Sequence, residues 1–115
     1  FDVAIVEQPL PDVAPKLPSG LRHLTLGNTF NQSLRGVSLP SSILELTFGN
    51  GFNQSLEGVA MPESLQSLAF GGKFNQSLEN LNLPSGLLAL TLGASFNHSL
   101  KGMKLPGCLE TLTFG

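Results

Sequence analysis

A Leu-Pro or Met-Pro pair recurs every 22 residues along this chain, and no insertion breaks the spacing. The pairs begin at Leu17, Leu39, Met61, Leu83 and Leu105. A Phe-Asn pair keeps the same period, beginning at Phe30, Phe52, Phe74 and Phe96, and so does a glycine, at Gly27, Gly49, Gly71, Gly93 and Gly115. Self-similarity at a fixed period of about 20 to 50 residues is the sequence signature of stacked repeat units. We therefore divide the chain into repeats 17–38, 39–60, 61–82 and 83–104, with a partial repeat 105–115.

A single repeat carries too few apolar residues to fold alone. In the first repeat the apolar columns are Leu17, Leu21, Leu24, Leu26, Phe30, Leu34 and Val37. Burial of these side chains does not offset the conformational entropy that is lost when the whole repeat is ordered. The repeats must therefore stack and share one core, as in a one-dimensional array.

Two apolar residues separated by one polar or small residue occur once in each repeat, as in Leu24-Thr25-Leu26. This alternation is typical of a strand that is buried on one side only. The prolines and glycines between these segments favour extended and turn conformations over helices. The predicted fold is a repeat solenoid similar to leucine-rich repeats, with one parallel β-sheet of about five strands and extended or turn segments on the other side. The strands are predicted near residues 22–26, 44–48, 66–70, 88–92 and 110–114.

Four other columns have predicted structural roles. The glycine after each strand indicates either a positive φ or a close approach between coils. The asparagine column should form an internal ladder, because a carboxamide both donates and accepts hydrogen bonds, and the phenylalanines beside it should stack in the core. A charged column should place Arg35 over Glu57 and Glu79 over Lys101 as weak surface pairs. The ladder residues are Asn31, Asn53, Asn75 and Asn97.

Residues 39–53 read Leu-Pro-Ser-Ser-Ile-Leu-Glu-Leu-Thr-Phe-Gly-Asn-Gly-Phe-Asn. This pattern resembles the FNIP repeat, a subtype of leucine-rich repeat, and the other repeats match it comparably over residues 17–115. The family usually places a proline two residues after the asparagine, where this chain has Ser33 and its equivalents, so the outer turn should differ in shape. The resemblance implies a protein-interaction role, and it supplies no catalytic residues.

Charge and composition exclude several classes of function. Charged residues make up 12% of the 115 residues and the formal net charge is −2, so no basic patch is available to bind nucleic acid. No apolar run approaches the roughly 20 residues of a membrane-spanning helix. The single cysteine, Cys108, cannot form an internal disulfide. The localisation stays open, with a soluble intracellular or organellar chain favoured.

The pattern contains no group of residues suited to catalysis or metal binding. A nucleophile, a base and an orienting acid would have to converge, and the repeat brings none of these together. His23 is predicted on a strand and His98 in a turn, on different faces, and no spacing suits metal ligands. We therefore expect no enzymatic activity, no metal and no cofactor.

The solvent side of the predicted sheet is the candidate binding face, because successive coils add their side chains to one continuous surface. The candidate end contacts are Val3, Ile5 and Val6 at one end and Leu109, Leu112 and Phe114 at the other. We interpret residues 1–16 as an N-terminal cap that adds an edge strand, or as an arm that inserts into a partner, followed by a Pro-rich linker. The face comprises His23, Thr25, Glu45, Thr47, Ser67, Ala69, Ala89, Thr91, Thr111 and Thr113.

These features favour a non-enzymatic module or scaffold that binds a protein partner of unknown identity. A structural accessory subunit of a large assembly, such as a membrane-bound photosynthetic complex of an alga, is the alternative, supported by the low charge and the open ends. An ice-binding solenoid is a third hypothesis, prompted by the threonine column, although only Thr111 and Thr113 provide a threonine doublet.

Overall fold

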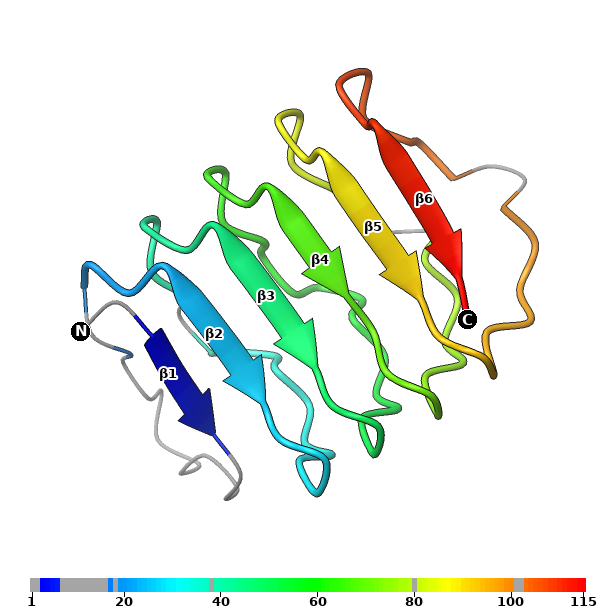
Figure 1. Ribbon diagram of the computed structural model, residues 1–115, viewed down its shortest axis with the longest axis horizontal. Coiled ribbons are helices and arrows are strands. Elements are labelled where there is room, and N and C mark those ends of the chain that lie inside the picture. Colours follow the sequence, from blue (N-terminus) through cyan, green and yellow to red (C-terminus); the bar gives the residue numbers. More distant parts are fainter. Residues whose placement is uncertain (1–2, 7–16, 18, 38, 80, 101–102) are drawn as a thin grey trace.

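One strand from each coil contributes to a single parallel sheet of six strands in the computed structural model (Figure 1). The structure describes residues 3–6, 17, 19–37, 39–79, 81–100 and 103–115. The returning segments lie behind the sheet, and the described residues contain no helix, so the solenoid has a sheet layer and a layer of extended and turn segments. In order across the sheet, the strands are β1 (Val3–Val6), β2 (His23–Leu26), β3 (Glu45–Phe48), β4 (Ser67–Ala69), β5 (Ala89–Leu92) and β6 (Thr111–Phe114).

Strand β1 makes the sheet one strand larger than the sequence predicted. It pairs in parallel with β2, with Val3 opposite His23 and Val6 opposite Leu26. This apolar run lies outside the 22-residue repeats, so the period does not predict a strand there. Residues Val3–Val6 therefore form an edge strand beside the first coil. The predicted Pro-rich linker lies in residues 7–16, outside the described residues.

The alternation within each strand directs one set of side chains into the core. In β3, Leu46 and Phe48 are buried whereas Glu45 and Thr47 are exposed. From β2 to β6 every strand residue lies opposite its equivalent 22 positions away, so the buried columns stack from coil to coil. The predicted solenoid and its parallel sheet are confirmed. In the first coil the buried positions are Leu21, Leu24, Leu26, Phe30 and Leu34.

Phenylalanine rings stack along the axis of the solenoid. In the column of Phe30, Phe52, Phe74 and Phe96, neighbouring ring centroids lie 6.3, 6.0 and 6.4 Å apart. Phe48 packs beside this column, with its ring centroid 4.2 Å from that of Phe52. Near-parallel rings at these distances add a specific packing term to the burial of apolar area. The core is therefore continuous from one coil to the next.

The glycine column permits close approach between coils and is not explained by positive φ angles. A Cβ added at Gly49 would lie 2.6 Å from the carbonyl oxygen of Gly27, and one added at Gly71 would lie 2.5 Å from the carbonyl oxygen of Gly49. No side chain fits at such a distance, because real Cβ atoms essentially never come closer than 3.0 Å. Of the two reasons that the sequence suggested, close approach applies here. The positive φ angles belong to Gly20, Gly36 and Gly58.

Candidate interaction surface

The solvent face of the sheet consists of two rows of side chains that run across the strands. The register places His23 opposite Glu45 and Thr25 opposite Thr47, and the later strands continue both rows. Every side chain in the rows is exposed or half-buried. The structure thus brings all the predicted face residues together on one surface: His23, Thr25, Glu45, Thr47, Ser67, Ala69, Ala89, Thr91, Thr111 and Thr113.

One His–Glu pair occurs on this face, and it is the only contact of this kind between a basic and an acidic side chain within the described part of the chain. His23 Nδ1 lies 2.9 Å from Glu45 Oε2, and both side chains are open to solvent. A solvated pair of this kind contributes about 0 to 1 kcal/mol to stability. Threonine, serine and alanine make up the rest of the face, so its chemistry is that of van der Waals contact and hydrogen bonding.

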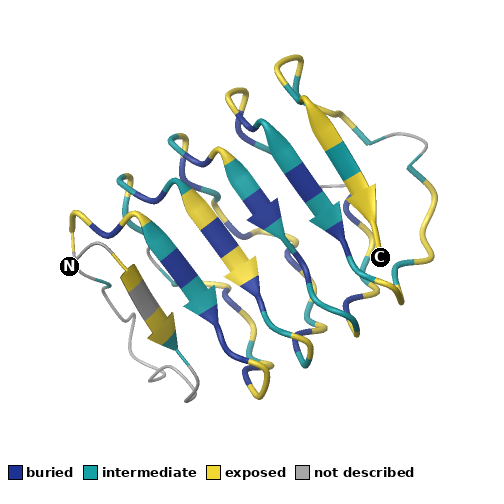
Figure 2. Ribbon diagram, in the orientation of Figure 1, coloured by how far each residue is buried: buried dark blue, intermediate teal, exposed yellow. Residues whose placement is uncertain are grey.

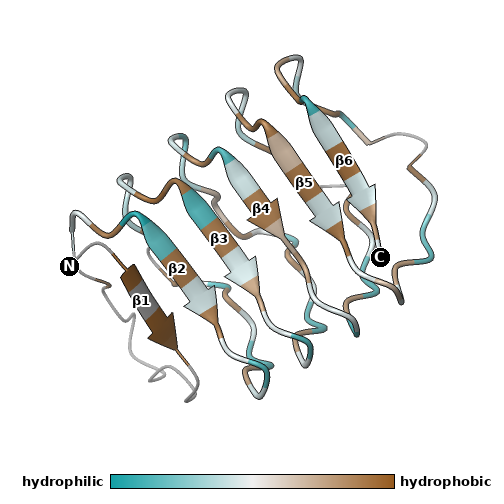
Figure 3. Ribbon diagram, viewed as in Figure 1, coloured by the Kyte–Doolittle hydropathy of each residue, from teal (hydrophilic) through white to brown (hydrophobic). Residues whose placement is uncertain are grey.

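Strand β1 extends the face with two apolar side chains. Val3 and Ile5 lie opposite His23 and Thr25 in the register, and they are 55% and 67% exposed. Figure 3 shows this apolar strand at the margin of the sheet. Val6, the third predicted end residue, is instead half-buried against the core. The exposed apolar area of the face is therefore concentrated at β1.

The coil that carries β6 leaves four apolar side chains more exposed than their equivalents in the preceding coils (Figure 2). Phe114 is 53% exposed, whereas its equivalent Phe48 is 2% exposed. Leu105 is 43% exposed, and the predicted end residues Leu109 and Leu112 are half-buried.

The asparagine ladder lies at the surface, so the predicted internal position is wrong. The side-chain oxygens of Asn31, Asn53 and Asn75 each accept a hydrogen bond of 2.9 Å from the backbone N–H of the equivalent asparagine in the next coil. All three residues and Asn97 are exposed. The phenylalanine that precedes each asparagine packs in the core, and the asparagine lies at the point where the backbone returns to the surface. The carboxamides therefore link the coils at their outer boundary.

A glutamine column, to which the sequence prediction assigned no role, reinforces this ladder. Gln54 Nε2 donates to Asn31 Oδ1 at 3.2 Å and to the Asn31 carbonyl oxygen at 3.3 Å, and Gln76 makes the same contacts one coil later. His98 stands in this column, with Nε2 3.0 Å from the carbonyl oxygen of the preceding ladder asparagine. The sequence could have predicted this column, because glutamine recurs with the 22-residue period at Gln32, Gln54 and Gln76.

Side-chain hydrogen bonds also join neighbouring coils at two other points. The Asn50 N–H donates to Asn28 Oδ1 at 3.0 Å, and the Gly72 N–H donates to Asn50 Oδ1 at 3.1 Å. The Ser42 hydroxyl donates to the Leu21 carbonyl oxygen at 2.6 Å. These contacts supply hydrogen-bond partners for backbone groups outside the sheet.

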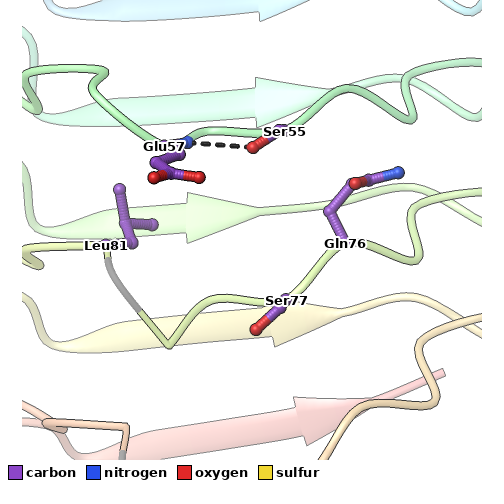
Figure 4. Close-up of a pocket in the computed structure, with 5 residues that line it drawn as sticks. All are labelled: Ser55, Glu57, Gln76, Ser77 and Leu81. Carbon is purple, nitrogen blue, oxygen red and sulfur yellow. Dashed lines mark hydrogen bonds between the residues drawn. The ribbon is translucent and has the colours of Figure 1, made fainter.

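The turn side of the solenoid carries shallow polar hollows between coils. In the hollow drawn in Figure 4, of about 110 Å³, the Ser55 hydroxyl oxygen accepts a hydrogen bond of 3.2 Å from the Glu57 N–H. Ser33 and Ser77 make the equivalent contact in their own coils. The serine that replaces the family's usual proline thus stabilises the outer turn. The lining residues are Ser55, Glu57, Gln76, Ser77 and Leu81.

The charged column does not form the predicted Arg35–Glu57 pair. Both residues line a neighbouring hollow of about 130 Å³, but no ion pair joins these two described side chains. The Arg35 side chain lies over Gly58 instead, where an added Cβ would be 3.2 Å from Arg35 Nε. The predicted partner of Glu79, Lys101, lies outside the described residues.

The described residues contain no group that is arranged for catalysis or for holding a metal. No three His, Cys, Asp or Glu side chains gather among them, and none of their polar or charged side chains is buried. His23 lies on the sheet, His98 in the glutamine column, and Cys108 is exposed. In this part of the chain there is also no helix of the length and hydrophobicity required to cross a membrane.

Stacked coils that each contribute one short parallel strand define a leucine-rich-repeat-like β-solenoid. The FNIP repeat family matches residues 8–51, 52–95 and 74–115, and the chain belongs to this family. Over 85% of its length the chain is also similar to a solved protein whose description is "The crystal structure of CroV588 a novel circular LRR protein structure", with 46% identity and a TM-score of 0.76. The match covers 14% of that chain. None of the curated proteins compared matches.

Proposed function

We propose that the chain is a protein-interaction module that binds its partner through the solvent face of the sheet, with β1 as the apolar margin of the site. The observation that carries the proposal is the position of Val3 and Ile5. They stand in the same two rows as His23 and Thr25, so exposed apolar area continues into the polar part of the face.

The chemistry of the face supports this proposal. Small side chains such as Thr47 and Ala69 allow a partner backbone to approach the sheet closely, and the threonine hydroxyl groups accept or donate hydrogen bonds. Apolar side chains near a polar rim are the usual source of binding energy in a protein interface. The described residues offer neither a buried polar pocket nor a metal site that would favour an enzyme.

Photo-crosslinking from the face tests the proposal. A photoreactive amino acid at Thr25 should capture a protein from a lysate of the source organism, and the same group at Glu79, on the turn side, should capture much less of it. The substitution Ile5→Asp should reduce the yield from Thr25 by at least about tenfold, because it places a charge where apolar area would be buried. Equal capture from both positions, with no effect of Ile5→Asp, would refute a site on this face.

Native purification separates this proposal from the structural-subunit alternative. An interaction module should be recovered with a partner that dissociates on dilution. An accessory subunit should be recovered with the same set of proteins at every dilution, in a fixed ratio. Recovery of such a fixed complex would favour the alternative.

A further inference from the structure

A single Asn-Gly pair occurs in the chain, at Asn50 and Gly51, in the turn that follows strand β3. Asparagine is a chemically labile residue. It is most labile before glycine, because a residue without a side chain lets its backbone nitrogen approach the preceding carboxamide carbon. Asn50 is exposed, so water reaches its carboxamide. The turn therefore brings together the groups that react when an asparagine deamidates.

The packing between the first two coils requires the glycine of this pair. A Cβ added at Gly51 would collide with the carbonyl oxygen of Asn28 in the preceding coil. The equivalent positions of the next two coils carry residues with side chains, Lys73 and Ser95. The larger residues that would slow the reaction at Asn50 are therefore excluded at this junction by contact between backbones.

The backbone nitrogen of Gly51 is available as a nucleophile. In the next two coils the equivalent N–H groups are paired: the Lys73 N–H donates to the Asn50 carbonyl oxygen and the Ser95 N–H donates to the Gly72 carbonyl oxygen, both at 3.1 Å. The Gly51 N–H donates to no acceptor within the described residues. Loss of its proton to hydroxide therefore breaks no hydrogen bond of the fold, whereas the same loss at Lys73 or Ser95 would break one.

The carboxamide of Asn50 is polarised for attack at its carbon. The Gly72 N–H donates to Asn50 Oδ1 at 3.1 Å. A donor at this oxygen stabilises the negative charge that develops there when a nucleophile adds to Cγ. In the described part of the chain no acceptor holds Asn50 Nδ2, so the leaving amine is open to water. We propose that Asn50 and Gly51 form a site of spontaneous deamidation.

The reaction consumes water and releases ammonia. The deprotonated Gly51 nitrogen bonds to Asn50 Cγ, the Cγ–Nδ2 bond breaks, and the amine leaves as ammonia with a proton from water. The product is a succinimide ring. Water then adds to one of the two ring carbonyl carbons, and the bond from that carbon to the Gly51 nitrogen breaks. Opening at Cγ gives aspartate, whereas opening at the backbone carbonyl carbon gives isoaspartate, in which the main chain runs through Cγ.

The two products affect the junction between the second and third coils differently. Aspartate keeps an acceptor oxygen for the Gly72 N–H, and its charge strengthens that hydrogen bond. Isoaspartate adds one carbon to the main chain and displaces the carbonyl group that accepts from the Lys73 N–H. The isoaspartate form should therefore weaken this junction. At neutral pH either product adds one negative charge to a formal net charge of −2.

Peptide mapping by mass spectrometry tests the proposal on the folded 115-residue chain, aged at mildly alkaline pH. Position 50 should gain the mass of deamidation at least about tenfold faster than position 28. Asn28 is the matched internal control, because its Oδ1 accepts from the Asn50 N–H at 3.0 Å but the next residue is Thr29. Labelling with an isoaspartate methyltransferase distinguishes the two products. Equal rates at the two positions, or an Asn50 that stays intact, would overturn the proposal.

Two variants complete the test. Thr29→Gly moves the reactive pair to the first coil as well, so Asn28 should then deamidate within about tenfold of the rate at Asn50. An unreactive Asn28 in this variant would overturn the role given to the glycine. Asn50→Asp is the control without a carboxamide, and it should gain no mass at this position. The proposal is independent of partner binding, because no step of the reaction involves the solvent face of the sheet.

Discussion

At the scale of single residues, the ladder asparagines connect coils through one oxygen atom. Asn53 Oδ1 accepts from the Asn75 N–H at 2.9 Å and from Gln76 Nε2 at 3.0 Å, so both of its lone pairs have donors. The asparagine is exposed, however, and water can replace these bonds in part when the side chain is removed. Its contribution to stability is therefore that of a surface hydrogen bond, not of a buried amide.

Replacing Asn53 by alanine should lower the free energy of unfolding by about 0.5 to 1.5 kcal/mol. The matched control is Asn97→Ala, because the Asn97 side chain accepts no hydrogen bond within the described residues. This control should change the free energy by less than about 0.5 kcal/mol. Urea denaturation of both variants measures the difference. Equal losses would show that the hydrogen bonds from coil to coil do not contribute.

Each ladder asparagine also begins an Asn-x-Ser triplet, the general acceptor pattern for N-linked glycans. In the first repeat the Asn31 oxygen accepts from the next coil, and the Ser33 hydroxyl oxygen accepts from the Arg35 N–H at 3.2 Å. In this chain the triplet thus supplies a side-chain acceptor oxygen at both of its outer positions.

The period predicted which residues are equivalent, but not how deep each column lies. Phe52 and Asn53 are adjacent and equally regular in the sequence, yet the first is fully buried and the second is exposed. Regular spacing fixes only the alignment of backbone positions between coils. The same limit explains the wrong prediction for Arg35, because a long side chain can turn away from the residue above it.

At the scale of the structural element, the glycine that follows each strand sets the distance between neighbouring coils. Gly71→Ala should destabilise the fold by at least about 2 kcal/mol, because the added methyl group would meet the backbone of the preceding coil. Gly86→Ala is the control, since that turn glycine has no atom within 4 Å of an added Cβ and no positive φ. It should be neutral or stabilising by up to about 1 kcal/mol. Thermal denaturation of the two variants should show a lower Tm for Gly71→Ala alone.

The strands could be predicted to different degrees. The alternation of apolar residues with polar or small ones located β2 to β6, because each of them carries its apolar residues on one side of the sheet. Strand β1 lacks this alternation, since Val3 and Ile5 are apolar on the solvent side as well. A short apolar run of this kind fits either an edge strand or an arm. Only its pairing with β2 distinguishes the two.

At the scale of the whole molecule, each coil contacts only its immediate neighbours in the sheet. The number of coils can therefore change without altering how any coil packs. Deletion of residues 39–60 should leave a folded chain with one strand fewer and a lower Tm. Gly71 would then pack on Gly27, and the Asn75 N–H would reach Asn31.

Deletion of residues 50–60 is the control, because it removes half as many residues but leaves one coil too short to pass around the core. This variant should lose the cooperative thermal transition that the larger deletion retains. Circular dichroism measured against temperature distinguishes the two. The interpretation fails if the smaller deletion leaves the more stable protein.

The close approach at the glycine column also has a direction. A Cβ on the later glycine of a pair meets the earlier coil, as Gly49 meets Gly27 and Gly71 meets Gly49. In evolutionary terms, each duplicated repeat inherits this restriction relative to the copy that precedes it. A gene of this kind can gain or lose whole repeats freely, whereas a point mutation at one glycine codon damages a single junction. Selection should therefore tolerate variation in repeat number more readily than variation at these codons.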